Sequence, residues 1–430
     1  RERDDEAAYL GLASTWIALR RPDRAEQVWR DLLAHVPGSI DGHFRLADRL
    51  IARGASREAE PHLRAVLERD PDHIDARLEL AHVMRRTNRL PLAIAETRRA
   101  FDRVGGTIDL GEELFWLLLE SGDRAGALDL LGLYDQTEGG AETRAAVARL
   151  YLAIDEPGLA RKQIDAILAA DPTSGEGLVL RARVRRAADD PAGARADLDL
   201  VADGTTGAGT ARALTAEYAL ADGDAAAALD LATRARVAHP RSAALVQTAA
   251  RALHALGKDA DARALIAAAI RARPDDAALF YAWAQFEDEA GQEDTALQVI
   301  ERLLLAQPDH VDALNFAGFA LADRGTDLPR AESLLLRARD LAPGDPLILD
   351  SWGWLRHRQG LDGDALRALE RATRIAPGQA DIWVHLGEVR LSSGNPRGAR
   401  AAYEQARRAH PTAAQARRIE VKLTALPPAP

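Results

Sequence analysis

The sequence predicts an all-α fold, an α-solenoid of about twelve stacked helical hairpins. Three observations predict it: a small residue that recurs at a fixed interval, prolines that close most intervals, and a helix-forming composition. Twelve alanines follow one another at steps of 34 residues, with one step of 33 and one of 35. Such a period is typical of helix-turn-helix arrays. The alanines are Ala25, Ala59, Ala93, Ala127, Ala160, Ala194, Ala228, Ala262, Ala296, Ala331, Ala365 and Ala399.

A second small residue precedes each alanine by about twelve positions and is expected on the other helix of the hairpin. Phe115 is the exception in this second row. Two helices approach closely only where both present small side chains, so the two rows predict the contact line of each hairpin. The second row comprises Ala13, Ala47, Ala81, Ala148, Ala182, Ala216, Ala250, Ala284, Gly318, Gly353 and Gly387.

Prolines, which cannot continue a helix, close most of the units. They are Pro37, Pro71, Pro172, Pro240, Pro274, Pro308, Pro343, Pro377 and Pro411. The composition agrees, because the chain is 47% hydrophobic but only 5% aromatic and shows no alternation typical of strands. A solenoid can reach 430 residues as one elongated domain, since each repeat contacts only its neighbours.

Four segments describe the expected organisation. Residues 1–206 and 207–411 form the two halves of the array, with about six repeats each. Residues 412–426 form a capping helix with Ile419, Val421 and Leu423 toward the array, and residues 427–430 form a proline-rich tail. Glycines in residues 203–209 allow two interpretations, a fixed turn between helices or a hinge between the halves.

The charge balance and the missing residue types exclude several function classes. The 56 basic and 66 acidic residues give a net charge of −10, which argues against nucleic acid as a partner. The basic cluster Arg181, Arg183, Arg185 and Arg186 is interpreted as a solvated helix face. The absence of cysteine excludes disulfides and thiol catalysis, and no apolar run is long enough to span a membrane.

No motif for catalysis, phosphate binding or metal binding occurs in the sequence. We therefore expect a non-enzymatic protein without a cofactor or a metal. The chain begins at Arg1 and not at methionine, so a targeting segment or a lipid anchor upstream is an open expectation.

The last unit carries a fuller pattern: Trp383, Leu386, Gly387, Ala399, Tyr403, Ala406 and Pro411. This pattern resembles the tetratricopeptide repeat, and the resemblance extends over nearly the whole chain. It implies a right-handed superhelix in which the first helix of every hairpin lines a concave groove. It also implies that the groove binds partner proteins or peptides.

The resemblance places five positions of each first helix on the groove face, and two of them, the fifth and the ninth, lie four residues apart. In the C-terminal units this face combines aromatic rings with amide and carboxylate groups. We expect Asn315 and Asp350 to bond the backbone of a bound peptide, and Phe319 and Trp354 to bury its side chains. The alternative is that both rings only cover neighbouring helices. The predicted partner-binding residues are Tyr281, Gln285, Asn315, Phe319, Asp350, Trp354, His357, Arg358 and Glu388.

Residues 314–325 and 348–354 resemble motifs of bacterial envelope tetratricopeptide-repeat lipoproteins, among them the adaptor of a periplasmic carboxyl-terminal processing protease. The resemblance implies a periplasmic scaffold, tethered to the outer membrane in some relatives, that delivers substrates to such a protease. A cytoplasmic location is the alternative. Two other functions stay open: a scaffold subunit for polysaccharide or pilus secretion, and the repeat domain of a larger enzyme.

Overall fold

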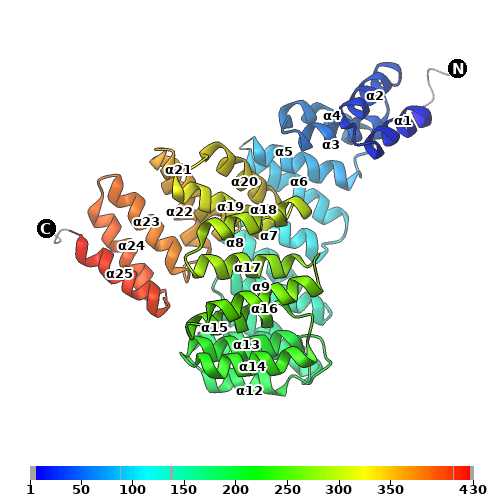
Figure 1. Cartoon of the computed structure of the whole chain (residues 1–430). Helices are drawn as coiled ribbons and strands as arrows, with labels where there is room; N and C mark the ends of the chain where they lie inside the picture. Colours follow the sequence, from blue (N-terminus) through cyan, green and yellow to red (C-terminus); the bar gives the residue numbers. More distant parts are fainter. Residues whose placement is uncertain (1–5, 88, 136–138, 410, 427–430) are drawn as a thin grey trace. The chain divides into compact units, whose positions relative to one another are not determined.

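The computed structural model describes every residue except 1–5, 88, 136–138, 410 and 427–430 (Figure 1). Over those described residues the chain forms 25 α-helices and no β-strand, which confirms the predicted fold class. Residue contacts group into two compact units, unit 1 (Arg1–Leu131) and unit 2 (Gly132–Pro430). The division falls within helix α8 (Arg124–Asp135).

The helices of unit 1 before α8 are α1 (Glu6–Ala18), α2 (Pro22–His35), α3 (Ile40–Ala52), α4 (Ser56–Arg69), α5 (Ile74–Arg86), α6 (Leu90–Arg103) and α7 (Ile108–Ser121). Those of unit 2 after α8 are α9 (Ala141–Ala153), α10 (Pro157–Ala170), α11 (Gly175–Ala187), α12 (Pro191–Leu200), α13 (Ala208–Ala221), α14 (Ala225–Ala238), α15 (Ala243–Ala255), α16 (Asp259–Ala272), α17 (Ala277–Glu289), α18 (Glu293–Ala306), α19 (Val311–Arg324), α20 (Leu328–Leu341), α21 (Pro346–Arg358), α22 (Asp362–Ile375), α23 (Ala380–Ser392), α24 (Pro396–Arg408) and α25 (Ala413–Ala425).

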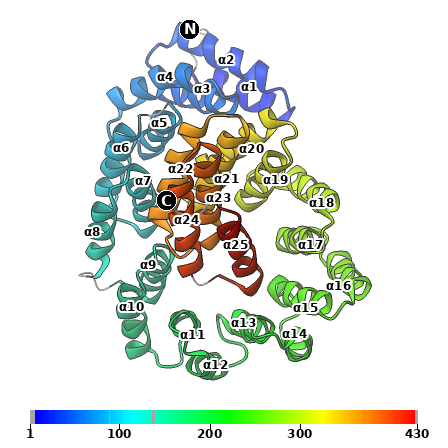
Figure 2. The same ribbon diagram turned by 90° about the vertical axis from the view of Figure 1, so that its left-hand side faces the viewer.

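Odd-numbered and even-numbered helices pair into hairpins, as the repeat predicts. In unit 2, for example, α13 packs on α14, α17 on α18 and α23 on α24. The first helices also contact one another from hairpin to hairpin, as α15 does with α17 and α19 with α21. Figure 2 shows the pairs α13–α14, α15–α16 and α17–α18 in chain order.

The two rows of small residues lie where the helices of each hairpin touch. All twelve alanines of the first row are 0% exposed, and the second row is buried as well. Gly353 shows why the second row must be small. A Cβ added there would lie 2.7 Å from Cγ of Leu369 and 3.2 Å from the carbonyl oxygen of Ala365. The predicted contact line is therefore confirmed.

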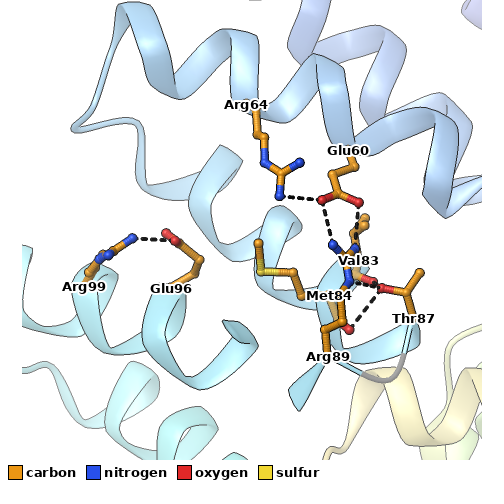
Figure 3. A network of polar contacts seen from close by, with 8 residues as sticks. All are labelled: Glu60, Arg64, Val83, Met84, Thr87, Arg89, Glu96 and Arg99. Carbon is orange, nitrogen blue, oxygen red and sulfur yellow. Dashed lines mark hydrogen bonds and ion pairs between the residues drawn. The ribbon is translucent and has the colours of Figure 1, made fainter. Parts of the chain in front are cut away.

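Buried carboxylates tie successive hairpins together, a feature that the sequence analysis did not anticipate. In unit 1, Glu60 on α4 accepts two hydrogen bonds from Arg89, which precedes α6, at 2.8 and 2.6 Å. Figure 3 shows Glu60 between Arg89 and Arg64, with Thr87 bonded in turn to Arg89. These hydrogen bonds from Arg89 hold the pKa of Glu60 below its ordinary value.

The same kind of contact corrects the interpretation of the arginine cluster on α11. Arg181 and Arg185 do not form a solvated face, because both bond the carboxylate of Asp197 on α12. The Asp197 side chain is only 2% exposed, and a buried carboxylate requires such partners. Arg186 makes a different contact, an ion pair with Asp222.

Arg212 of α13 contacts the chain at the start of the glycine-rich segment at residues 203–209. Its guanidinium donates to the carbonyl oxygens of Leu198 and Val201, at 3.0 and 2.7 Å, and to Asp203 at 3.0 Å. The fixed turn and the hinge both stay interpretations of the sequence. The compact units divide at residues 131/132 and not at the expected 206/207, and the expected division into halves stays an interpretation of the sequence.

The final helix, α25, has nearly the predicted bounds and mostly the predicted orientation. Ile419 and Leu423 are buried, whereas Arg417 and Glu420 are exposed. Val421 was expected to face the array but is 67% exposed, because it lies two positions from Ile419 on a helix of 3.6 residues per turn. The expected tail, residues 427–430, lies outside the described residues.

Candidate protein-binding site

The predicted binding residues lie on four first helices of unit 2, α17, α19, α21 and α23. Contacts join α19 to α21 and α21 to α23, so these helices follow one another side by side. Residues four positions apart lie on one face of a helix. We call the residues Tyr281, Gln285, Asn315, Phe319, Asp350, Trp354 and Glu388 the first-helix row.

The row begins on α17 with an aromatic and an amide side chain, both partly exposed. The Tyr281 ring stacks on His310, with ring centroids 5.8 Å apart. Burial, with the nearby Asp312 carboxylate, raises the pKa of the Tyr281 hydroxyl to about 12, so this group stays a neutral donor and acceptor. The Gln285 carbonyl accepts a hydrogen bond from the amide of Gln247 on α15, at 2.7 Å.

Asn315 on α19 differs from its neighbours in the row, because its Oδ1 atom is buried and has no hydrogen-bond partner. The residue as a whole is partly exposed. A buried acceptor without a partner costs roughly 1–3 kcal/mol, so a donor supplied to this position would recover free energy.

Asp350 and Trp354 on α21 are engaged inside the protein, around a residue that the sequence analysis missed. That residue is His385 on α23, whose Nδ1 lies 2.9 Å from each carboxylate oxygen of Asp350. The Trp354 ring stacks on the imidazole with centroids 4.8 Å apart, and the Phe319 ring lies 5.7 Å from it. Trp354 also donates its indole N–H to Asp323 at 2.9 Å.

The electrostatics of this cluster favour a charged imidazole. Burial by itself would lower the pKa of His385, but the charge and the hydrogen bonding of Asp350 raise it above its ordinary value. Glu388 and Asp381 on the same helix act in the same direction. The imidazolium then lies against the face of the Trp354 ring, where a cation is attracted by the aromatic quadrupole.

These contacts correct the expectation that Asp350 and Trp354 are open to a partner. Trp354 is only 7% exposed, and both oxygens of Asp350 are used by His385. The packing interpretation of Trp354 therefore holds in the described structure. Phe319 is partly exposed.

Of the remaining predicted residues, Glu388 is near enough to His385 to raise its pKa, and the His357 ring lies 5.3 Å from the Trp354 ring. His357 Nδ1 lies 2.7 Å from Asp362 Oδ1, and Arg358 is exposed near Gly325 at the end of α19. Glu388 forms an ion pair with Lys422 of α25. Whether any predicted residue contacts a partner stays a prediction.

Val384, 34 residues after Asp350, is the residue of α23 that corresponds to Asp350 in the repeat. His385 is the next residue, so a prediction restricted to the row positions did not include it. The one available signal was an acidic residue and a histidine on adjacent first helices, 35 residues apart. That spacing is too common among charged helices to identify a pair from sequence.

The described residues contain no group of three or more His, Cys, Asp or Glu side chains arranged to hold a metal ion. Within the same part of the chain, no helix is long and apolar enough to cross a membrane.

Comparison with known proteins identifies the repeat. Models of the tetratricopeptide repeat match residues 50–104, 281–346 and 363–423. A tetratricopeptide-repeat-containing protein of Pseudomonas aeruginosa, PA4667, is 36% identical over 115 residues. The match covers 27% of this chain and 19% of that protein, so the chain spans about a fifth of its relative.

Two solved structures align with the chain at low sequence identity. Yeast Tom70 aligns over 97% of this chain and 95% of its own, with a TM-score of 0.47 and 13% identity. TTC0263 of Thermus thermophilus, a tetratricopeptide-repeat protein, aligns over 43% of this chain and 100% of its own, with a TM-score of 0.37 and 23% identity. From the sequence models and the stacked hairpins, residues 50–104, 281–346 and 363–423 are tetratricopeptide repeats.

Proposed function

We propose that the protein is an interaction scaffold that binds a peptide segment of a partner protein on the first-helix row of unit 2. Tetratricopeptide-repeat arrays generally use such extended surfaces for binding. The observation that carries the proposal is the unmet acceptor of Asn315. The other polar members of the row, Gln285, Asp350 and Glu388, each have a partner in the described structure.

The groups around Asn315 suit a peptide ligand. Oδ1 is buried in the described structure, so a backbone N–H of a bound peptide would reach it after a rotation of the Asn315 side chain. The partly exposed Phe319 ring lies one turn along α19, and the partly exposed Tyr281 ring stacks on His310, just ahead of the same helix. Aromatic side chains commonly carry the largest share of binding energy at interfaces. The contact centre is thus expected on α17 and α19, with Trp354 bonded to Asp323 in the last turn of α19.

The test is the selection of binding peptides from a displayed library, followed by measurement of their dissociation constants by fluorescence anisotropy. The double variant Asn315→Ala with Phe319→Ala should bind at least about tenfold more weakly, since truncation of one aromatic at a hot spot removes ~2 kcal/mol. Leu305→Ala, at an 85% exposed position on the second helix α18, is the control and should bind normally. Equal affinity of the double variant and the parent, with intact helicity, would place binding elsewhere.

We also propose a more specific role for this protein. It would act as a periplasmic adaptor, tethered to the membrane or free, that delivers substrate proteins to a carboxyl-terminal processing protease. Support comes from residues 314–325 and 348–354, which resemble envelope lipoproteins of this kind. The test is degradation of a candidate substrate by the purified protease with and without this protein. No acceleration by the protein would exclude this role and leave the peptide-binding proposal standing.

A further inference from the structure

Two imidazoles meet between the helices of the α3–α4 hairpin in unit 1. His43 lies in the first turn of α3, and His62 lies in the middle of α4. Their Nδ1 atoms are 2.8 Å apart, and their ring centroids are 5.1 Å apart. Both residues are partly exposed, so the pair is not sealed from solvent. The pair is separate from the first-helix row of unit 2 and has no part in the binding proposed there.

The hydrogen bonds of the pair determine where its protons lie. Nε2 of His43 lies 3.2 Å from the carbonyl oxygen of Pro37, and a carbonyl only accepts, so this nitrogen carries a proton. Nδ1 of the neutral ring is then an acceptor, and His62 donates its Nδ1–H to it. A histidine that donates one ring N–H to a backbone carbonyl and keeps the other nitrogen free is arranged as metal ligands commonly are.

The charges around the pair favour neutral rings. Burial is the main cause that lowers the pKa of His43 and the pKa of His62, and it is assisted by Arg69 of α4 at His43 and by Arg30 of α2 at His62. Arg30 is itself paired with Glu26 at 2.6 Å. Neutral imidazole is the form that binds metals. Because the two arginines repel cations, the pair favours a metal that bonds strongly to nitrogen over Ca²⁺ or Mg²⁺, which prefer oxygen ligands.

The distance between the two nitrogen atoms fits a single metal ion. Imidazole nitrogens lie about 2.0–2.1 Å from a bound transition metal, so two such ligands at a right angle are ~2.8–3.0 Å apart. The two Nδ1 atoms are at this spacing already. Tetrahedral ligands would be ~3.3–3.4 Å apart, so the pair suits Cu²⁺ or Ni²⁺ in tetragonal geometry better than tetrahedral Zn²⁺.

We propose that Nδ1 of His43 and Nδ1 of His62 bind one Cu²⁺ or Ni²⁺ ion as neighbouring ligands of a tetragonal site, with water in the other positions. The His62 proton moves from Nδ1 to Nε2 when the metal binds, and a rotation of the rings turns both lone pairs from each other toward the ion. The ion thereby replaces a hydrogen bond between α3 and α4. Because the unfolded chain does not hold the two rings together, the bound ion stabilises the folded hairpin.

The test is isothermal titration calorimetry of the full 430-residue chain with copper(II) or nickel(II) chloride. We expect one site, whose affinity falls at least about tenfold in His43→Gln and in His62→Gln, the low end of the loss that follows removal of even an outer partner of a metal ligand. His254→Gln is the matched control and should bind normally, because His254 Nδ1 faces Asp259 Oδ1 at 2.8 Å in place of a second imidazole.

Two further measurements keep the test independent of how well the variants fold. Electron paramagnetic resonance of the Cu²⁺ complex of the parent should show two imidazole nitrogens on the metal. Added Ni²⁺ should raise the urea midpoint of the parent and of His254→Gln, but not those of the other two variants. A Cu²⁺ spectrum with a single nitrogen ligand, or equal affinity of the parent and a folded His62→Gln, would refute the site and leave the pair as a hydrogen bond of the hairpin.

Discussion

Asp350→Asn should weaken the packing of α21 against α23 in a pH-dependent way. The substitution keeps the size of the side chain but removes the charge that faces His385 at 2.9 Å. The two side chains are only 10% and 18% exposed, so solvent screens their interaction little. Hydrogen bonds to charged groups are worth roughly 1.5–3 kcal/mol, and we expect a loss in that range near pH 6.

The sign of the pH dependence follows from the raised pKa of His385. A group whose pKa is higher in the folded state stabilises that state fully below its unfolded pKa, about 6.5 for histidine. This contribution is lost as the pH rises through the folded pKa. The stability difference between the parent and Asp350→Asn should therefore narrow as the pH rises above about 6.5 and through the folded-state pKa of His385.

Urea midpoints across this pH range measure the difference, and an NMR titration of the His385 imidazole reports its pKa directly. Asp364→Asn is the control, because its pair with Arg367 is exposed and should contribute less than about 1 kcal/mol at any pH. A His385 pKa near 6.5 in the folded protein, or a midpoint difference that does not change with pH, would refute the reasoning.

Three further substitutions test the packing. Trp354→Ala should cost about 3–5 kcal/mol, as for other buried aromatics, and a melting temperature equal to the parent's would show that Trp354 does not support α23. Ala365→Leu should overpack a fully buried hairpin contact and cost about 1–3 kcal/mol in urea unfolding, whereas an unchanged midpoint would mean that the register is wrong. Arg263→Ala should cost roughly 1–3 kcal/mol, because Glu287, 2% exposed, loses its ion pair at 2.8 Å and keeps the indole N–H of Trp283 at 3.1 Å. An unchanged midpoint would show that the bond from Trp283 is enough to satisfy Glu287.

The helical hairpins and their contact line could be predicted because they depend on residue size at a fixed period. An alanine at every 34th position is visible without any knowledge of neighbours, and its burial follows from helix packing. The row of first-helix residues came from the resemblance to the tetratricopeptide repeat, and the spacing of four positions agrees with one shared helix face.

The contacts made by long polar side chains could not be predicted in the same way. Position alone suggests that Arg263 is an exposed residue that tolerates truncation, yet it bonds the buried Glu287 of the next helix. His385 reaches back to Asp350 by a similar route. Such pairs depend on side-chain rotamers and on the offset between neighbouring helices. The period of the repeat determines neither of them. For this reason the expectation that the side chains of Asp350 and Trp354 are open to a partner was wrong.

The buried carboxylates that join hairpins keep the period of the alanines. Glu26 and Glu60 are 34 residues apart, and each pairs with an arginine of the following hairpin, Arg49 and Arg89. A recombination that deleted residues 27–60 would place Glu26 29 residues before Arg89, which is the spacing that Glu60 has now. A repeat can therefore be lost or gained at this point while the buried carboxylate stays in register with an arginine.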